Sequence, residues 1–149
     1  RAEYDWEIAS EDPSWKILEG PAALYRNGKI FLAYSANTCW TDNYCLGMLT
    51  ADEDADLMDP KSWKKSPEPV FQKCMENKAY GPGHNSFTLS PDGTEDYLVY
   101  HLITDPFTGE GGRARHACIQ KFTWREDGTP DFGKPAAPGE ELPLPSGEK

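Results

Sequence analysis

Two ionisable residues stand beside similar glycine-proline turns. Glu19 directly precedes a Gly-Pro pair, and His84 ends the run Gly-Pro-Gly-His, 65 residues further along the chain. A carboxyl group can act as a general acid if burial and its neighbours raise its pKa. A neutral imidazole can hold a metal ion or an ordered water through one ring nitrogen while a hydrogen bond fixes the other. The plainer alternative is that Glu19 is a solvated loop carboxylate and that His84 only satisfies backbone groups in its turn.

The two turns open two related stretches of sequence, residues 20–35 and 81–101. Each contains Gly-Pro, a short apolar segment, an Asn-Gly or Asp-Gly pair, and a second apolar segment that ends in Tyr and a polar residue. The two pairs, Asn27-Gly28 and Asp92-Gly93, predict hairpins because these residues tolerate the positive φ that such turns require. Further strand-like segments follow each stretch, at 44–51 and 62–71 in the first copy and at 115–124 and 130–138 in the second.

Four antiparallel strands that recur after 61 residues are typical of β-propeller blades. We therefore predict an all-β fold with blade-like repeats at about 16–71 and 75–138, followed by an extended tail at 139–149. The innermost strands of a propeller line one axial channel, so Glu19 and His84 should converge there. A propeller needs about four to eight blades to close. Another chain must therefore supply the remaining blades, or copies of this chain must assemble.

The composition agrees with strands and tight turns. Only 38% of the 149 residues are hydrophobic, and there are 13 Gly and 13 Pro, which favours short strands over a helical bundle. The formal charge of -10 argues against a nucleic-acid partner. No apolar run approaches the roughly 18 residues of a membrane span. The four cysteines show no zinc-site spacing, and free thiols are favoured over disulfides, although three pairings stay open.

Five segments occur in a fixed order between about Trp15 and Pro135. They are "ILEGPAALYRNGKIFLAYSAN", "YCLGML", "GPGHNSF", "YLVYH" and "IQKFTWREDGTPDFGKP". The series resembles the C-terminal three-fifths of a glycoside hydrolase family 43 catalytic domain, and within that family the α-L-arabinofuranosidases. The resemblance implies a five-bladed β-propeller, of which this chain would supply about the last three blades.

The resemblance also implies roles for particular residues. Glu19 matches the general acid of the family's Glu-Gly-Pro motif. His84 matches a histidine of the central channel that lies near a bound calcium or a water cluster. Two roles for His84 are open: contact with a structural calcium ion through water, because calcium prefers oxygen ligands, or tuning of the charge near Glu19. The chemistry itself requires no cofactor.

The same resemblance implies three residues that contact substrate. Arg115 best matches an arginine that reaches the active site from the third strand of its blade, and Arg113 is a weaker candidate. Trp40 and Tyr44 lie where a loop could meet the sugar, since aromatic faces pack well on sugar C–H groups. Core packing is an equally good interpretation of Tyr44.

The implied activity is removal of α-L-arabinofuranosyl units from arabinoxylan or arabinan, in secreted hemicellulose degradation, by an inverting mechanism. Inversion needs a second carboxylate about 6.5–9.5 Å from the acid. The family places this base, and an Asp that tunes the acid, in blades before this chain begins. We therefore expect an N-terminal fragment of the same precursor as partner. The alternatives are a non-catalytic sugar-binding propeller, or a β-xylosidase or endo-arabinanase on the same fold.

Overall fold

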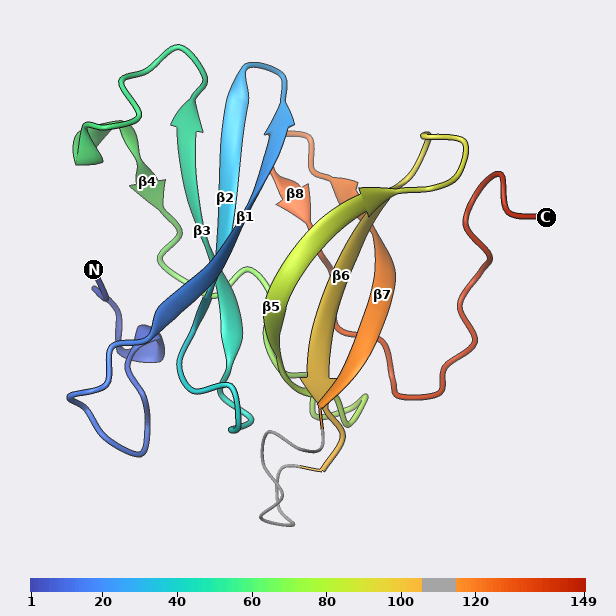
Figure 1. Ribbon diagram of the computed structural model, residues 1–149, viewed down its shortest axis with the longest axis horizontal. Helices are drawn as coiled ribbons and strands as arrows, with labels where there is room; N and C mark the ends of the chain where they lie inside the picture. Colours follow the sequence, from blue (N-terminus) through green and yellow to red (C-terminus); the bar gives the residue numbers. More distant parts are fainter. Residues whose placement is uncertain (106–114) are drawn as a thin grey trace.

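Eight strands form two four-stranded antiparallel sheets in the computed structural model, which describes residues 1–105 and 115–149 (Figure 1). The first sheet has the order β1 (Leu18–Arg26), β2 (Lys29–Ala36), β3 (Cys45–Asp52) and β4 (Lys64–Lys65). The second has the order β5 (Tyr80–Leu89), β6 (Asp96–Ile103), β7 (Arg115–Trp124) and β8 (Pro130–Asp131). Each predicted repeat thus forms one sheet.

The described residues supply two such sheets, against the three or so blades expected. Residues 1–17 add no strand and contain one short 3₁₀ turn, η1 (Asp5–Glu7). A second turn, η2 (Pro60–Ser62), lies in the acidic connection before β4. Within the part of the chain that the structure describes, we find no helix that is long and apolar enough to cross a membrane.

Both predicted hairpins are present. Arg26 pairs with Lys29, so Asn27 and Gly28 form a two-residue turn with φ of 49° and 73°. Two successive positive φ values give the turn whose twist matches that of paired strands. The second hairpin has a longer connection between Leu89 and Asp96, in which Gly93 also has a positive φ of 73°.

The two sheets pack face to face, with β5 beside β1 (Figure 1). The core between them is made of buried apolar side chains from both sheets and from the segments beside β4 and β8: Phe31, Leu46, Met48, Phe71, Leu98, Tyr100, Leu102, Phe122 and Phe132. Alternate residues of β6, which are Leu98, Tyr100 and Leu102, face this core, as the alternation in the sequence predicts, whereas β2 contributes Phe31 and is buried on both faces. Packing of the two sheets fixes the inner strands β1 and β5 relative to each other.

Residues 1–9 cover part of the opposite face of the first sheet. Trp6 stacks on Tyr34 with ring centroids 6.4 Å apart. Glu7 is fully buried and accepts hydrogen bonds from the Tyr34 hydroxyl at 2.7 Å and from Lys65 Nζ at 2.9 Å. Burial alone would raise the pKa of Glu7, but hydrogen bonds from the Glu3 amide, Lys65 and Tyr34 outweigh burial and lower this pKa.

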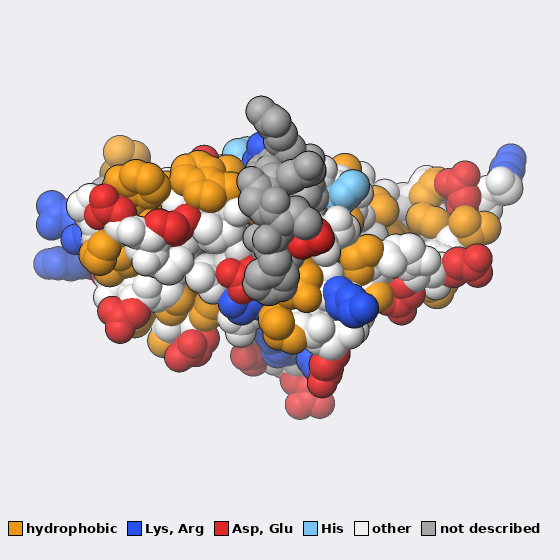
Figure 2. All heavy atoms as spheres, turned by 90° about the horizontal axis from the view of Figure 1, so that it is seen from below, with side chains coloured by type: hydrophobic (Ala, Val, Ile, Leu, Met, Phe, Trp, Pro, Cys, Tyr) orange, Lys and Arg blue, Asp and Glu red, His pale blue; other side chains and the backbone are white. Residues whose placement is uncertain are grey.

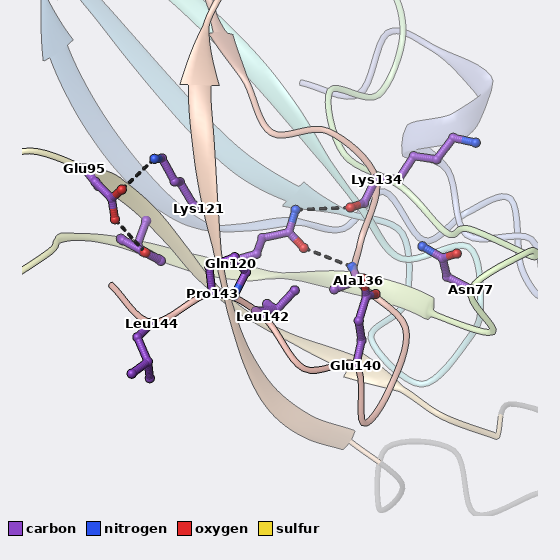
Figure 3. A pocket seen from close by; sticks show the side chains of 11 residues that line it. Asn77, Glu95, Gln120, Lys121, Lys134, Ala136, Glu140, Leu142, Pro143 and Leu144 are labelled. Atoms are coloured by element: carbon purple, nitrogen blue, oxygen red, sulfur yellow. Dashed lines mark hydrogen bonds and ion pairs between the residues drawn. The ribbon is translucent and has the colours of Figure 1, made fainter. Parts of the chain in front are cut away.

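The tail after β8 runs without strands along the second sheet (Figure 3). Gln120 of β7 holds its first part, donating to the carbonyl oxygens of Phe132 at 2.8 Å and Lys134 at 3.2 Å and accepting from the Ala136 amide at 3.1 Å. A pocket of about 370 Å³ lies between this sheet and the tail. None of the predicted site residues lines this pocket. Hydrogen bonds from Gln120 to the segment after β8 indicate that the pocket lies where the tail packs on the sheet.

All four cysteines are free thiols in the described residues, as the sequence favoured. Cys45 and Cys74 are buried, whereas Cys39 and Cys118 are half-buried. Burial raises the pKa of the Cys45 thiol to about 12, with a smaller contribution from the charge of Glu7. Such a thiol is unreactive at neutral pH.

Candidate active site

The predicted site residues gather at one end of the two sheets, the lower end in Figure 1. Glu19 at the start of β1 pairs with Ser35 near the end of β2. Gly83, the residue before His84, pairs with His101 near the end of β6. Glu19 and His84 therefore lie at closely corresponding levels of their sheets. Figure 2 looks onto this end from below and shows histidine side chains among apolar and acidic groups.

The Gly-Pro turns interrupt both inner strands. The register of β1 shifts between Glu19 and Ala22, where Gly20 has a φ of 55°. The register of β5 shifts twice, and both Gly81 and His84 have a φ of 52°. Positive φ is natural for glycine and uncommon for histidine. Bulges of this kind re-aim side chains, and here they occur beside Glu19 and at His84, whose side chains both contact Tyr44.

Tyr44 connects Glu19 with His84. Its hydroxyl donates a hydrogen bond to Glu19 Oε1 at 2.7 Å and lies 3.5 Å from His84 Nδ1. The backbone N–H of His84 donates to Ser35 Oγ at 2.7 Å. A Cβ atom on Gly20 would lie 3.3 Å from the His84 ring, so this glycine lets the imidazole lie close over β1. The structure thus brings the two predicted residues into one cluster.

The ring of Tyr44 is fully buried, so neither face is open to a sugar in this structure. A Cβ on Gly83 would come within 2.3 Å of the Tyr44 ring, which explains the second glycine of Gly-Pro-Gly. Burial raises the pKa of Tyr44; a hydrogen bond with Ser35 opposes this rise, and the hydrogen bond to Glu19 adds to it. Tyr44 therefore remains a neutral phenol that donates to Glu19, rather than an exposed sugar platform.

His101 completes the cluster and was missed in the sequence. Its ring stacks on Tyr44 with centroids 5.4 Å apart and planes at 9°, and it lies 6.4 Å from the His84 ring. Burial lowers the pKa of His101 to about 4, with help from the charges of Arg115 and His84 and against that of Glu19. The imidazole is therefore neutral at neutral pH. Its Nε2 atom is buried and has no hydrogen-bond partner in the described part of the chain.

A signal for His101 exists in the repeats. The second strand of each repeat ends in Tyr and a polar residue, which are Tyr34 and Ser35 in β2 and Tyr100 and His101 in β6. Ser35 contacts the backbone of His84, and His101 contacts its ring, so both polar positions serve the same cluster. Comparing the two repeats position by position would have identified this histidine.

Arg115 lies beside the cluster, at the first position of β7. It shares the lining of a pocket of about 430 Å³ with His84 and His101, and its charge acts on His101. The weaker candidate, Arg113, lies outside the described residues. The structure therefore places the preferred arginine next to the predicted channel histidine.

Trp40 stands apart from this cluster. It belongs to the 37–44 loop, at the same end of the sheets, and is 45% exposed. Its ring packs edge-on against Trp15, itself 44% exposed, with centroids 6.2 Å apart. The two indoles offer an aromatic surface of the kind that packs on sugar rings.

The residues around His84 do not form a direct calcium site. Calcium takes six to eight oxygen ligands, whereas the polar groups that reach this imidazole and its backbone are the hydroxyls of Tyr44 and Ser35. Within residues 1–105 and 115–149 no group of three or more His, Cys, Asp or Glu side chains could hold a metal ion. A contact of His84 with an ion through water stays a prediction.

Comparisons with known proteins identify the family. The model for glycosyl hydrolases family 43 matches residues 3–130 of the chain. The chain belongs to this family. Among family 43 relatives, an alpha-L-arabinofuranosidase 43 of Humicola insolens is 49% identical over 144 residues, which are 89% of this chain and 29% of that protein. An extracellular exo-alpha-(1->5)-L-arabinofuranosidase of Streptomyces avermitilis is 48% identical, with the same coverage. The chain thus spans less than a third of the length of these curated relatives.

Solved structures agree with this assignment to family 43. The alpha-L-arabinofuranosidase of Lactobacillus brevis superposes with a TM-score of 0.84 at 49% identity, over 93% of this chain and 42% of that one. The Cellvibrio cellulosa alpha-L-arabinanase, at 19% identity and a TM-score of 0.53, shares the fold. The prediction of an all-β, partial β-propeller is confirmed.

Proposed function

We propose that the protein containing this chain removes α-L-arabinofuranosyl units from arabinoxylan or arabinan, with Glu19 as general acid. The observation that carries the proposal is the half-buried Glu19 carboxylate, fixed by Tyr44 at the start of an inner strand and beside His84. Membership of family 43 supports a glycosidase. The names of the Humicola and Streptomyces relatives support arabinofuranosides as substrates.

The proposed reaction proceeds with inversion. Glu19 protonates the departing glycosidic oxygen, while a carboxylate on another segment activates a water on the opposite face of the sugar. Arg115 and His84 line the adjacent pocket, where their N–H groups can bind sugar hydroxyls. The exposed indoles of Trp40 and Trp15 provide an outer surface for the polysaccharide.

The segment that carries the base is proposed to cover the open face of the first sheet. This face has a pocket of about 560 Å³ whose lining includes Glu19 and the apolar side chains of Leu32, Leu49 and Trp63. The blades of a propeller pack face to face, and exposed apolar faces of this kind mark interaction surfaces. An N-terminal segment of the same precursor is the proposed partner, and the extracellular space is the proposed location because two Streptomyces relatives are named extracellular.

The test is to incubate the full-length protein with arabinan and arabinoxylan oligosaccharides and to follow the products by chromatography and proton NMR. We expect free arabinose, released first as the β-anomer. Initial release of the α-anomer would contradict inversion. Binding of the oligosaccharides without release would favour the sugar-binding propeller, and release of xylose from unsubstituted xylo-oligosaccharides would favour a β-xylosidase.

A further inference from the structure

We propose that Tyr44 is a positioning residue for Glu19, and that the flat ring of His101 holds Tyr44 in the orientation this requires. The inference rests on the proposed acid role of Glu19 and extends it to two residues that need not touch the substrate. Two contacts support it. The His101 ring stacks on the Tyr44 ring, and the Tyr44 hydroxyl donates a hydrogen bond to one oxygen of Glu19.

The Tyr44 hydroxyl selects one oxygen of the carboxyl group. It donates to Oε1 at 2.7 Å, a short bond typical of a hydroxyl donor and a carboxylate. When Glu19 carries a proton, the oxygen that already accepts from Tyr44 is the poorer place for it. The transferable proton therefore resides on Oε2, and rotation of the carboxyl group is restricted by the same bond. A general acid needs such an orientation, because transfer depends on hydrogen-bond reach to the leaving oxygen.

Tyr44 itself cannot move easily, because it is enclosed on two sides. Gly83 lies so close that a single added carbon atom would overlap the ring, at 2.3 Å. His101 covers the ring in a nearly parallel stack, at 5.4 Å between centroids and 9° between planes. Aromatic pairs in such arrangements contribute about 0.5–1.5 kcal/mol beyond the area they bury. The phenol is thus fixed by packing before any substrate binds.

A second buried tyrosine in the chain also donates a hydrogen bond to a glutamate, and this second pair provides a comparison. Tyr34, also buried, donates to Glu7 at 2.7 Å, but Glu7 in addition receives the ammonium of Lys65 at 2.9 Å. An ammonium favours the ionised carboxylate, whereas a hydroxyl can donate to a protonated carboxyl group as well. The Tyr44 hydroxyl can therefore keep its hydrogen bond to Glu19 in both states of the carboxyl group. Tyr34→Phe removes an equivalent bond and serves as the control for loss of stability alone.

The test compares two arabinofuranoside substrates in the full-length protein. A 4-nitrophenyl arabinofuranoside has a leaving group that needs little protonation, whereas an arabino-oligosaccharide needs a well-placed acid. For Tyr44→Phe we expect kcat on the oligosaccharide to fall roughly 10- to 100-fold and kcat on the nitrophenyl substrate to fall no more than about 3-fold. For Tyr34→Phe we expect lower thermal stability and no difference between the two substrates.

The role of His101 is tested by rescue. His101→Phe keeps a flat ring against Tyr44. Because His101 also lines the pocket beside Arg115, the readout is the ratio of kcat on the two substrates, which should stay close to the wild-type ratio in His101→Phe. His101→Ala removes the ring and should show the same substrate-dependent loss as Tyr44→Phe. If His101→Phe is as impaired as His101→Ala, the ring nitrogens matter and the supporting role of the ring is wrong.

The result that overturns the inference is an equal effect of Tyr44→Phe on both substrates. Glu19→Gln, measured in parallel, separates this failure from that of the proposed function. A substrate-dependent loss in Glu19→Gln without one in Tyr44→Phe refutes the positioning role alone. Absence of a substrate-dependent loss in Glu19→Gln refutes Glu19 as the acid and the positioning role with it.

Discussion

The buried Glu7 should make the stability of the first sheet depend on pH. Its carboxylate accepts from the Tyr34 hydroxyl, from Lys65 Nζ and from the amides of Glu3 and Tyr4, at 2.6 to 3.0 Å. Glu7→Gln keeps the shape but removes the charge, and it places an amide group where only an acceptor fits. The Lys65 side chain is 11% exposed, so in a nearly dry site its ammonium would lose its nearest carboxylate and keep only the Arg1 carbonyl at 2.7 Å and the more distant Glu3.

The expected cost follows from these contacts. Removing one partner of a buried ion pair costs about 3–5 kcal/mol, and the slight exposure of Lys65 places this pair at the lower end. We expect Glu7→Gln to lower the free energy of unfolding by about 3 kcal/mol at pH 7. Glu3→Gln is the matched control, because Glu3 is 60% exposed and its oxygen lies 4.0 Å from Lys65. That variant should lose less than about 1 kcal/mol.

The sign of the pH dependence follows from the lowered pKa of Glu7. A carboxyl group with a lower pKa in the folded protein stabilises it fully above the unfolded value, about 4.3, and progressively less as the pH falls through the folded pKa. The stability gap between the wild type and Glu7→Gln should therefore be constant from pH 6 to 8 and narrow in acid. Urea titrations followed by tryptophan fluorescence measure this gap. A gap of the same size at low pH and at pH 7 would refute the reasoning.

Three further outcomes are expected. Gly83→Ala should lower the free energy of unfolding by about 3 kcal/mol, because its Cβ would lie 2.3 Å from Tyr44. Gly93 has open space around it and a φ of 73°, so Gly93→Ala should lower the free energy of unfolding by about 1 kcal/mol. Equal losses for the two glycine variants in urea titrations would contradict this explanation. Iodoacetamide at pH 8 should leave Cys45 unmodified in the native protein, because burial raises the pKa of its thiol to about 12. Mass spectrometry measures the modification, and a rate as fast as in urea would show that the Cys45 thiol is accessible. His84→Ala should lower turnover and melting temperature and abolish any response to calcium or chelator; unchanged kcat under both conditions would make His84 structural.

Local chemistry made much of the fold predictable. Asn27-Gly28 specifies a tight turn by its backbone preferences, and the alternation along β6 specifies which of its faces packs in the core. Convergence of Glu19 and His84 followed from the order of the repeats. The outer strands were overestimated. The segment at 62–71 contributes only Lys64–Lys65 as a strand, with a single further bridge at Phe71, because Pro67 and Pro69 have no N–H to donate to a neighbouring strand.

The contacts inside the site were not predictable in the same way. Tyr44 reaches Glu19 from the end of an irregular loop, which has no period that would orient its side chain. The stack of His101 on Tyr44 joins a residue of β6 to the loop that precedes β3, so it depends on how the two sheets pack. The contact of Trp40 with Trp15 likewise joins two loops.

The role of Glu19 is tested most directly by kinetics of Glu19→Gln in the full-length protein. Gln keeps the shape of the side chain and can still accept from the Tyr44 hydroxyl, but it has no acidic proton to transfer. We predict that kcat for arabinose release from arabino-oligosaccharides falls by about 10²–10⁴, and that the loss on a 4-nitrophenyl arabinofuranoside is much smaller. Slight and equal effects on both substrates would contradict the assignment of Glu19 as the general acid.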